Sequence, residues 1–137
     1  MSLQSRLADL ITELGDDFKL GTVPLVFSAQ GELDARTGVS KIPLLGSGVI
    51  VGVKAWLNTA PTGGTTFKVD VNKNDTTIFA TQANRPIWAA SANAATVGAH
   101  STTTFVDGDR LSCDIDEVGS TVPGSDLTVA VYILRTG

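Results

Sequence analysis

The densest group of side chains that could do chemistry lies between residues 107 and 117, where five carboxylates accompany a single arginine. In a strand, alternate residues face the same side, so Asp114 and Asp116 would share a face opposite Cys113. Adjacent carboxylates can bind a cation or act as the acid and base of glycoside hydrolysis. Nothing in the sequence isolates one of them in the apolar surroundings that raise a carboxyl pKa. We therefore interpret the group as a solvated polar face and predict neither a metal site nor a catalytic set.

Two other motifs match ligand loops only in part. Residues 70–75 carry oxygen-bearing side chains at alternate positions, like the start of a calcium loop, but the required glycine and glutamate are missing downstream. Residues 46–48 read Gly-Ser-Gly, yet the following run of valine and isoleucine predicts a strand rather than the helix of a phosphate loop. The first stretch predicts a hairpin turn, and the second a turn with a close approach between strands.

His100 and Cys113 are the only histidine and the only cysteine. A zinc site needs three or four suitable ligands, and a catalytic nucleophile needs a base beside it, so this pair meets neither requirement. Alternation with Leu111 and Ile115 predicts that Cys113 is a small buried residue. We expect no enzymatic activity and no cofactor.

The tryptophans are the residues best suited to contact a ligand. A sugar site combines an aromatic face with amide and charged hydrogen-bond partners. Asn84, Arg85, Trp88 and Trp56 could supply these groups and are candidate glycan contacts. The alternative is that Trp88 packs over the mouth of the domain as an ordinary apolar residue.

The elements that must position these residues are β-strands. Alternating apolar residues predict three consecutive strands joined by two tight turns over residues 48–81, with Val49, Val51 and Val53 on the core face. Further strands are predicted over residues 22–29, 33–36, 39–44, 102–106, 111–118 and 127–135. Residues 33–36 and 39–44 would form a short pair, and residues 82–99 a long ordered loop. The fold class is therefore mainly β: a jelly-roll-like antiparallel β-sandwich of about eight strands preceded by one short N-terminal α-helix.

The helix signal covers residues 2–20, with Ser2 as its N-cap. Leu3, Leu7, Leu10 and Leu14 repeat at the spacing of coiled-coil seam positions. A helix this short is marginal alone in water, so its leucines must be covered by its own domain or by the same helix in other subunits. Because the stripe is narrow, we favour self-association through these four leucines. The chain divides into an N-terminal helix, 1–21, for oligomerisation or anchoring, and a β-sandwich domain, 22–137.

The last strand is apolar on both sides. Leu127, Val129, Val131 and Ile133 form one face, while Ala130, Tyr132 and Leu134 form the other. One face would line the core, and the other would contact a neighbouring subunit through Tyr132 and Leu134. The alternative is that the loop over residues 82–99 covers Tyr132 and Trp56.

Composition limits the classes of partner. The net charge is −4, and the ten basic residues form no run or stripe, so we expect no nucleic-acid partner. The apolar runs are too short to predict membrane insertion, and the first residues lack the order of a signal peptide. A single cysteine fits synthesis in a reducing cytoplasm.

Four stretches and the preceding helix have counterparts in one group of proteins. The stretches are VKAWLNTAPTG at 53–63, VDVNKN at 69–74, TQANRP at 81–86 and DIDEVGSTVPGSDLTV at 114–129, and the helical part is 7–19. They resemble a β-sandwich module and short helical segments in virion proteins of phages that infect actinobacteria, namely minor-tail and tail-fibre-like proteins. The resemblance covers nearly the whole chain, and it implies no catalytic or ligand residues.

The resemblance implies a non-enzymatic structural protein located in the virion and synthesised in the host cytoplasm. The helix would anchor or organise the assembly, which we expect to be a homotrimer in contact with other capsid or tail proteins. The sandwich would face outward and adhere to a host cell-surface glycan. The alternative is a small capsid-decoration or head-fibre protein, and a glycan-active enzyme is a third hypothesis.

Overall fold

A computed structural model describes the backbone of residues 2–137, and the side chains except those of residues 11 and 13–20. The described chain contains one α-helix, one short 3-10 helix and nine strands. They are α1 (Leu3–Leu20), β1 (Val23–Glu32), β2 (Lys41–Pro43), β3 (Gly48–Thr59), β4 (Phe67–Lys73), β5 (Thr76–Thr77), η1 (Gln82–Asn84), β6 (Ile87–Trp88), β7 (Thr104–Phe105), β8 (Arg110–Glu117) and β9 (Ser125–Arg135).

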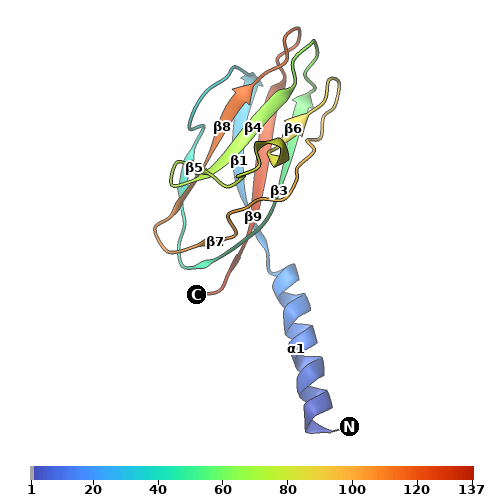
Figure 1. Ribbon diagram of the computed structural model, residues 1–137, viewed down its shortest axis with the longest axis vertical. Coiled ribbons are helices and arrows are strands. Elements are labelled where there is room, and N and C mark those ends of the chain that lie inside the picture. Colours follow the sequence, from blue (N-terminus) through green and yellow to red (C-terminus); the bar gives the residue numbers. More distant parts are fainter. Residues whose placement is uncertain (1) are drawn as a thin grey trace.

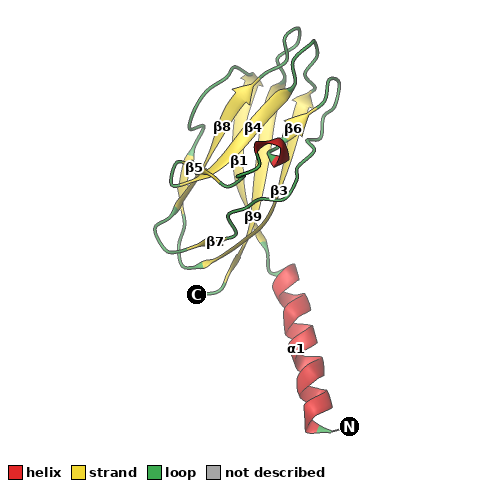
Figure 2. Ribbon diagram, viewed as in Figure 1, coloured by secondary structure: helices red, strands yellow, loops and turns green. Residues whose placement is uncertain are grey.

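The strands form two sheets that pack face to face (Figure 1, Figure 2). Sheet A has the order β1-β9-β3-β7, and sheet B has the order β2-β8-β4-β5, with β6 paired to β4. Pairing within both sheets is antiparallel. Apart from β6, the two facing sheets have four strands each, in the orders β1-β9-β3-β7 and β2-β8-β4-β5, which makes the eight-strand arrangement of a jelly roll. The predicted fold class is confirmed.

The core fills the space between the sheets. Its largest fully buried side chains are Trp88, Phe27, Phe67, Phe79, Phe105, Leu57, Ile78, Leu111, Ile115, Leu127, Val69 and Val71. Phe67 and Trp88 meet edge to face, with ring centroids 5.1 Å apart and planes at 82°. Such an aromatic pair adds stability beyond the area it buries, about 0.5–1.5 kcal/mol.

The prediction of a three-strand meander over residues 48–81 is wrong at its first turn. β3 pairs with β9 in sheet A, whereas β4 pairs with β8 in sheet B, so the connection between β3 and β4 crosses from one sheet to the other. The long strands β3 and β9 match each other from Gly48–Arg135 to Thr59–Ser125, a longer ladder than a hairpin with β4 offers. The second turn is confirmed: Asn74 and Asp75 have φ of 51° and 66°, as a tight hairpin turn requires.

The predicted core face of β3 is wrong in its first half, because this strand contains a β-bulge. The register against β9 shifts between Ile50 and Gly52, and this extra residue inverts the alternation. Ile50 and Val53 are buried, whereas Val49 is half-buried and Val51 is 50% exposed. The valines at 49 and 51 therefore do not share the core face with Val53.

The predicted pair between residues 33–36 and 39–44 does not form. Arg36 instead bridges to Ile115, and the Val39 N–H donates to the Cys113 carbonyl at 2.8 Å. Both halves thus lie along the edge of β8. The Asp114 carboxylate holds the intervening turn, because it accepts a 2.7 Å hydrogen bond from the Gly38 N–H.

Residues 82–99 are more ordered than a simple loop. They contain η1 and β6, and Ile87 and Thr96 exchange backbone hydrogen bonds of 3.0 and 2.8 Å. The Ala95 N–H donates to the Ala55 carbonyl at 3.1 Å. The segment therefore runs along the edge of β3 and also reaches β6, which closes one side of the sandwich.

α1 projects away from the sandwich (Figure 1). The predicted cap is present, since the Ser5 N–H donates to the Ser2 hydroxyl at 3.1 Å. Leu3, Leu7 and Leu10 are 81%, 54% and 49% exposed, so the domain of the same chain does not cover them. The predicted contact at Leu14 lies outside the described side chains. Within the described residues, no helix has the length and apolarity needed to cross a membrane.

Candidate functional site

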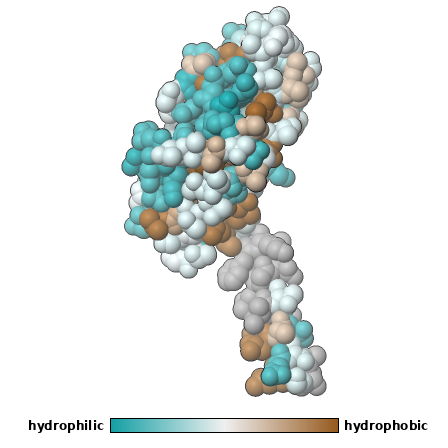
Figure 3. Space-filling model, viewed as in Figure 1, coloured by the Kyte–Doolittle hydropathy of each residue, from teal (hydrophilic) through white to brown (hydrophobic). Residues whose placement is uncertain are grey.

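The outer faces of the two sheets have opposite chemistry. The outer positions of β4 and β8 are polar or charged, and the side of the molecule on which these strands lie is largely hydrophilic (Figure 3). On sheet A, residues 24–28, 52–56 and 128–134 contain one charged residue, Lys54. Ligand binding therefore has to be considered separately for each face.

On sheet B, the buried residues Asp70 and Asn72 have hydrogen-bond partners. Asp70 is only 8% exposed and accepts hydrogen bonds from the Thr77 hydroxyl at 2.7 Å and the Val71 N–H at 2.9 Å. The Asn72 amide donates to Asp114 Oδ2 at 2.8 Å. Because Asp70 and Asp114 are direct cross-strand partners, these hydrogen bonds offset the repulsion between two carboxylates. The arrangement stabilises the sheet, and the carboxylates of Asp70 and Asp114 are both used in these hydrogen bonds.

Arg85 belongs to this same polar face. Its guanidinium forms a 2.6 Å ion pair with Asp116, the outward neighbour of Asp114 on β8. Partial burial raises the pKa of Asp116, and the charge of Arg85 opposes that increase. The Arg85 Nε atom is buried without a hydrogen-bond partner. Arg85 is thus committed to an ion pair on the face opposite the tryptophan at residue 56.

The other predicted acidic residues each have their own partner. Asp107 accepts from the Gly46 N–H, Asp109 from the Val106 N–H and the Asn74 amide, Glu117 from Thr66, and Asp75 pairs with Lys41 and Arg110. The hydrogen bond from Val106 lowers the pKa of Asp109, and that from Lys41 lowers the pKa of Asp75. Among the described residues, no three potential metal ligands converge. Within residues 70–75, Asp70 accepts from the Thr77 hydroxyl, Asn74 accepts from the Arg110 N–H, and Asp75 pairs with Lys41 and Arg110.

His100 forms a hydrogen bond with the backbone, and Cys113 lies in the core. His100 Nε2 lies 2.9 Å from the Ile50 carbonyl, which can only accept, so this nitrogen donates. Cys113 is fully buried in the core, as predicted. Burial raises the pKa of its thiol, and the carboxylates of Asp114 and Asp70 add to that increase.

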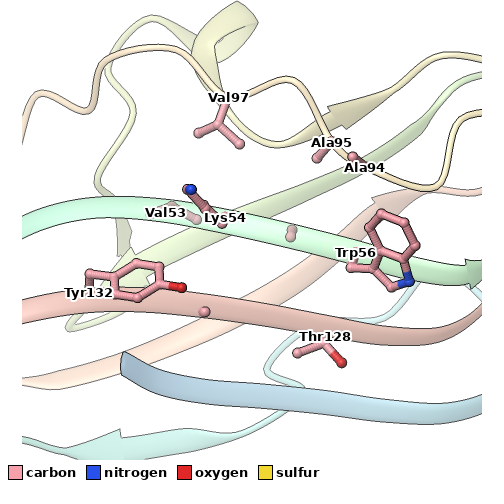
Figure 4. Close-up of a pocket in the computed structure, with 10 residues that line it drawn as sticks. Val53, Lys54, Trp56, Ala94, Ala95, Val97, Thr128 and Tyr132 are labelled. Carbon is pink, nitrogen blue, oxygen red and sulfur yellow. The ribbon is translucent and has the colours of Figure 1, made fainter. Parts of the chain in front are cut away.

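The outer face of sheet A carries an open groove of about 510 Å³ (Figure 4). Its floor comes from β3 and β9, and one wall comes from the segment that follows β6. The lining residues are Val53, Lys54, Ala55, Trp56, Ala94, Ala95, Val97, Thr128, Ala130 and Tyr132. The volume falls within the range of small-molecule sites, about 300–1,000 Å³. We take this groove as the candidate functional site.

Trp56 and Tyr132 lie at opposite ends of the groove (Figure 4). Trp56 is 49% exposed, and its indole N–H donates to Asn58 Oδ1 at 3.1 Å, which orients the ring. Tyr132 pairs with Gly52 across the strands, where the glycine leaves open space beside the ring. Lys54 projects from β3 between them. The bulge in β3 places Lys54 and Trp56 on the outer face, because it inverts the alternation of side chains after Val51.

The predicted glycan contacts do not come together. Trp56 lines the groove, but Trp88 is fully buried, so its assignment as a glycan contact is wrong. Its indole N–H donates to the Asn93 carbonyl at 2.8 Å, as an interior tryptophan requires. Asn84 donates to the Ala99 carbonyl at 3.1 Å and does not line the groove.

Sequence reasoning missed Lys54 and Thr128 as neighbours of Trp56. The signal for them was the period of two in β3 and β9, which places both on the outer face, but the pairing of these strands was not predicted. The segment over residues 94–97 forms a wall of the groove rather than a cover. The alternative that the loop buries Trp56 is therefore not what the structure shows.

Leu134 lies apart from this groove, beside the end of the helix. It is half-buried and lines a smaller hollow of about 180 Å³ with Gly21, Val23 and Leu25. The two predicted interface residues of β9 thus fall in different places: Leu134 lies near the helix junction and Tyr132 lies in the groove.

The fold and the groove define a jelly-roll sandwich with one apolar outer face, carried on a projecting helix. This architecture supports many unrelated functions, so its class alone assigns none. Comparison of the chain with protein-family models, curated proteins and solved structures found no match.

Proposed function

We propose that this chain is a non-enzymatic structural protein of a phage particle, in which α1 self-associates and holds the sandwich outward. The observation that carries the assembly is the exposure of Leu3, Leu7 and Leu10 on a helix that its own domain leaves uncovered. The sequence stretches that resemble virion proteins support the location in a phage particle.

Physical chemistry favours a covered seam over an exposed one. Fully burying a leucine side chain stabilises a protein by about 1.5–3 kcal/mol relative to leaving it in water. Leu7 and Leu10 are adjacent seam positions of a heptad, and Leu3 precedes them by one turn. A narrow seam suits a second copy of the same helix better than a broad sheet surface. We propose a homotrimer, with Leu134 close to the point where the helices meet the sandwiches.

Charge insertion at the seam tests this proposal. Leu7→Glu with Leu10→Glu should reduce the sedimentation coefficient to that of a monomer, because glutamate keeps helix propensity but cannot be buried in the seam. Ala8→Glu with Thr12→Glu is the matched control, since it adds the same charge away from the seam. The proposal fails if the two double variants sediment alike.

The groove on sheet A favours adhesion as the role of the outward sandwich. A half-exposed tryptophan and a tyrosine in one groove are typical of surfaces that bind a partner. We propose that this face contacts a host cell-surface glycan when the chain is a tail-fibre or minor-tail component. A capsid-decoration or head-fibre role is the alternative, and there the partner would be the capsid itself.

A glycan-active enzyme would need a poised pair of carboxylates. On sheet B, Asp114 accepts from Gly38 and Asn72, and Asp116 is paired with Arg85, which supports a structural role for both. Glycan turnover that is lost in Asp114→Ala and Asp116→Ala variants of unchanged stability would favour the enzyme instead.

A further inference from the structure

We infer that the groove between Trp56 and Tyr132 binds an acidic oligosaccharide, a short chain of sugar rings that carries a carboxylate. The inference rests on the proposed adhesive role and names the chemical class of its ligand. It depends on three features of the groove: two spaced aromatic rings, a lysine that pairs with no described residue, and two hydroxyl groups that form no hydrogen bond to a described residue.

The aromatic spacing suits a chain of rings rather than a single ring. Trp56 pairs with Thr128 across the strands, and Tyr132 lies four residues further along β9. At about 3.3 Å per residue, the two aromatic positions are about 13 Å apart along the strand. Sugar rings present flat C–H faces that stack on aromatic rings. The hydrogen bond from Trp56 to Asn58 fixes the indole before a ligand arrives, which reduces the entropy lost on binding.

Lys54 supplies the charge that selects an acidic ligand. In the described sandwich, six lysines and arginines pair with carboxylates: Arg36, Lys41, Lys68, Lys73, Arg85 and Arg110. Lys54 and Arg135, in contrast, form no ion pair with any described residue, and only Lys54 of the two lines the groove. It projects between the two aromatic rings, in a groove that contains no carboxylate. An anionic group on the ligand would complement it directly.

The hydroxyl groups of Thr128 and Tyr132 complete the polar set. Neither forms a hydrogen bond to a described residue, so both remain available to sugar hydroxyls. The rest of the lining is small and apolar, with alanines at 55, 94, 95 and 130. This combination of an apolar floor and a few polar groups is typical of small-molecule sites.

A second copy of the chain is a poorer occupant of this face. The groove-forming strand segments 52–56 and 128–134 carry no carboxylate. Two copies that packed through this face would therefore bury Lys54 without a partner, which is strongly unfavourable. A ligand that brings its own anionic group avoids this penalty.

Nuclear magnetic resonance of the full chain offers a direct test, because the two indole N–H resonances report different places. Trp56 lies in the groove, and Trp88 lies in the core as an internal control. The probes are trigalacturonate and sialyllactose, which are acidic, and maltotriose, which is neutral. We expect saturable shifts of the Trp56 resonance with an acidic probe, at least tenfold weaker affinity for maltotriose, and no shift of Trp88.

Variants link the effect to the groove. Lys54→Gln should weaken binding of the acidic probe at least tenfold, whereas Arg135→Gln, which removes a cation outside the groove, should not. Tyr132→Ala should also weaken it, and Val106→Ala, an exposed apolar residue elsewhere, should not. An unchanged Trp88 resonance verifies that each variant is folded.

Three results would overturn the inference. They are the absence of any Trp56 shift with either acidic probe, equal affinity for maltotriose, and equal losses in Lys54→Gln and Arg135→Gln. If Trp56→Ala reduces the oligomeric mass while no probe binds, the face belongs to a second copy. Failure of the seam variants to change sedimentation would instead contradict the proposed assembly and leave this binding measurement intact.

Discussion

At the residue scale, the two tryptophans show how one side-chain type serves two purposes. Trp88 is fully buried against Phe67 and uses its indole N–H on a backbone carbonyl, so it stabilises the core. Trp56 is half-exposed and is oriented by Asn58, so its ring is presented to solvent. Sequence alone could not separate them, since each is flanked by apolar residues and the difference arises from the face of its strand on which each tryptophan lies.

Cys113 provides a residue-scale prediction. Because burial raises the pKa of its thiol, the thiolate is scarce at neutral pH and the side chain is inaccessible. We expect the native chain to resist a maleimide reagent and the chain in denaturant to react completely. Mass spectrometry after a short labelling pulse measures this. Rapid labelling of the native chain would contradict the assignment of Cys113 to the core.

At the element scale, the bulge in β3 determines the groove. Without the extra residue between Ile50 and Gly52, the alternation would continue unbroken and place Lys54 and Trp56 on the same buried face as Ile50. The structure instead buries Ile50 and still presents Trp56 outward. A bulge leaves almost no trace in a single sequence, which explains why the core face of this strand was only partly predictable.

Gly48 tests the pairing of β3 with β9 at its tightest point. A Cβ atom there would lie 2.2 Å from the Leu134 carbonyl oxygen, which belongs to the backbone and cannot move easily. Gly48→Ala should therefore destabilise the fold by about 1–3 kcal/mol in chemical denaturation. Gly52→Ala in the same strand is the control, because open space surrounds that position. Equal stability of the two variants would contradict this close approach.

The sequence predicts local elements better than their partners. The apolar alternation of β4, β8 and β9, the cap at Ser2 and the turn at residues 74–75 follow from neighbours in the chain and are confirmed. The pairing of β3 with β9 and of β2 with β8 joins strands far apart, so no local pattern specifies it. The groove depends on that pairing, and of its lining residues only Trp56 and Tyr132 were predicted to contact a ligand or a subunit.

At the scale of the whole molecule, the outer faces of the two sheets differ: that of sheet B carries ion pairs and hydrogen bonds, and that of sheet A carries the groove. The outer face of sheet B is closed by its own ion pairs and hydrogen bonds. On the outer face of sheet A, Lys54, Thr128 and Tyr132 form no hydrogen bond or ion pair with any described residue, and on α1 Leu3, Leu7 and Leu10 are exposed. This asymmetry is the physical basis for proposing that the chain acts by assembly and adhesion.

The most direct test of this account is the mass of the unmodified chain in solution, measured by light scattering across a dilution series while helix content is followed by circular dichroism. A seam that holds the helices together predicts a mass of three chains, each of 14.2 kDa, and a helical signal that decreases when dilution lowers the mass. A monomer mass throughout the series at micromolar concentration, with an unchanged helical signal, would contradict it.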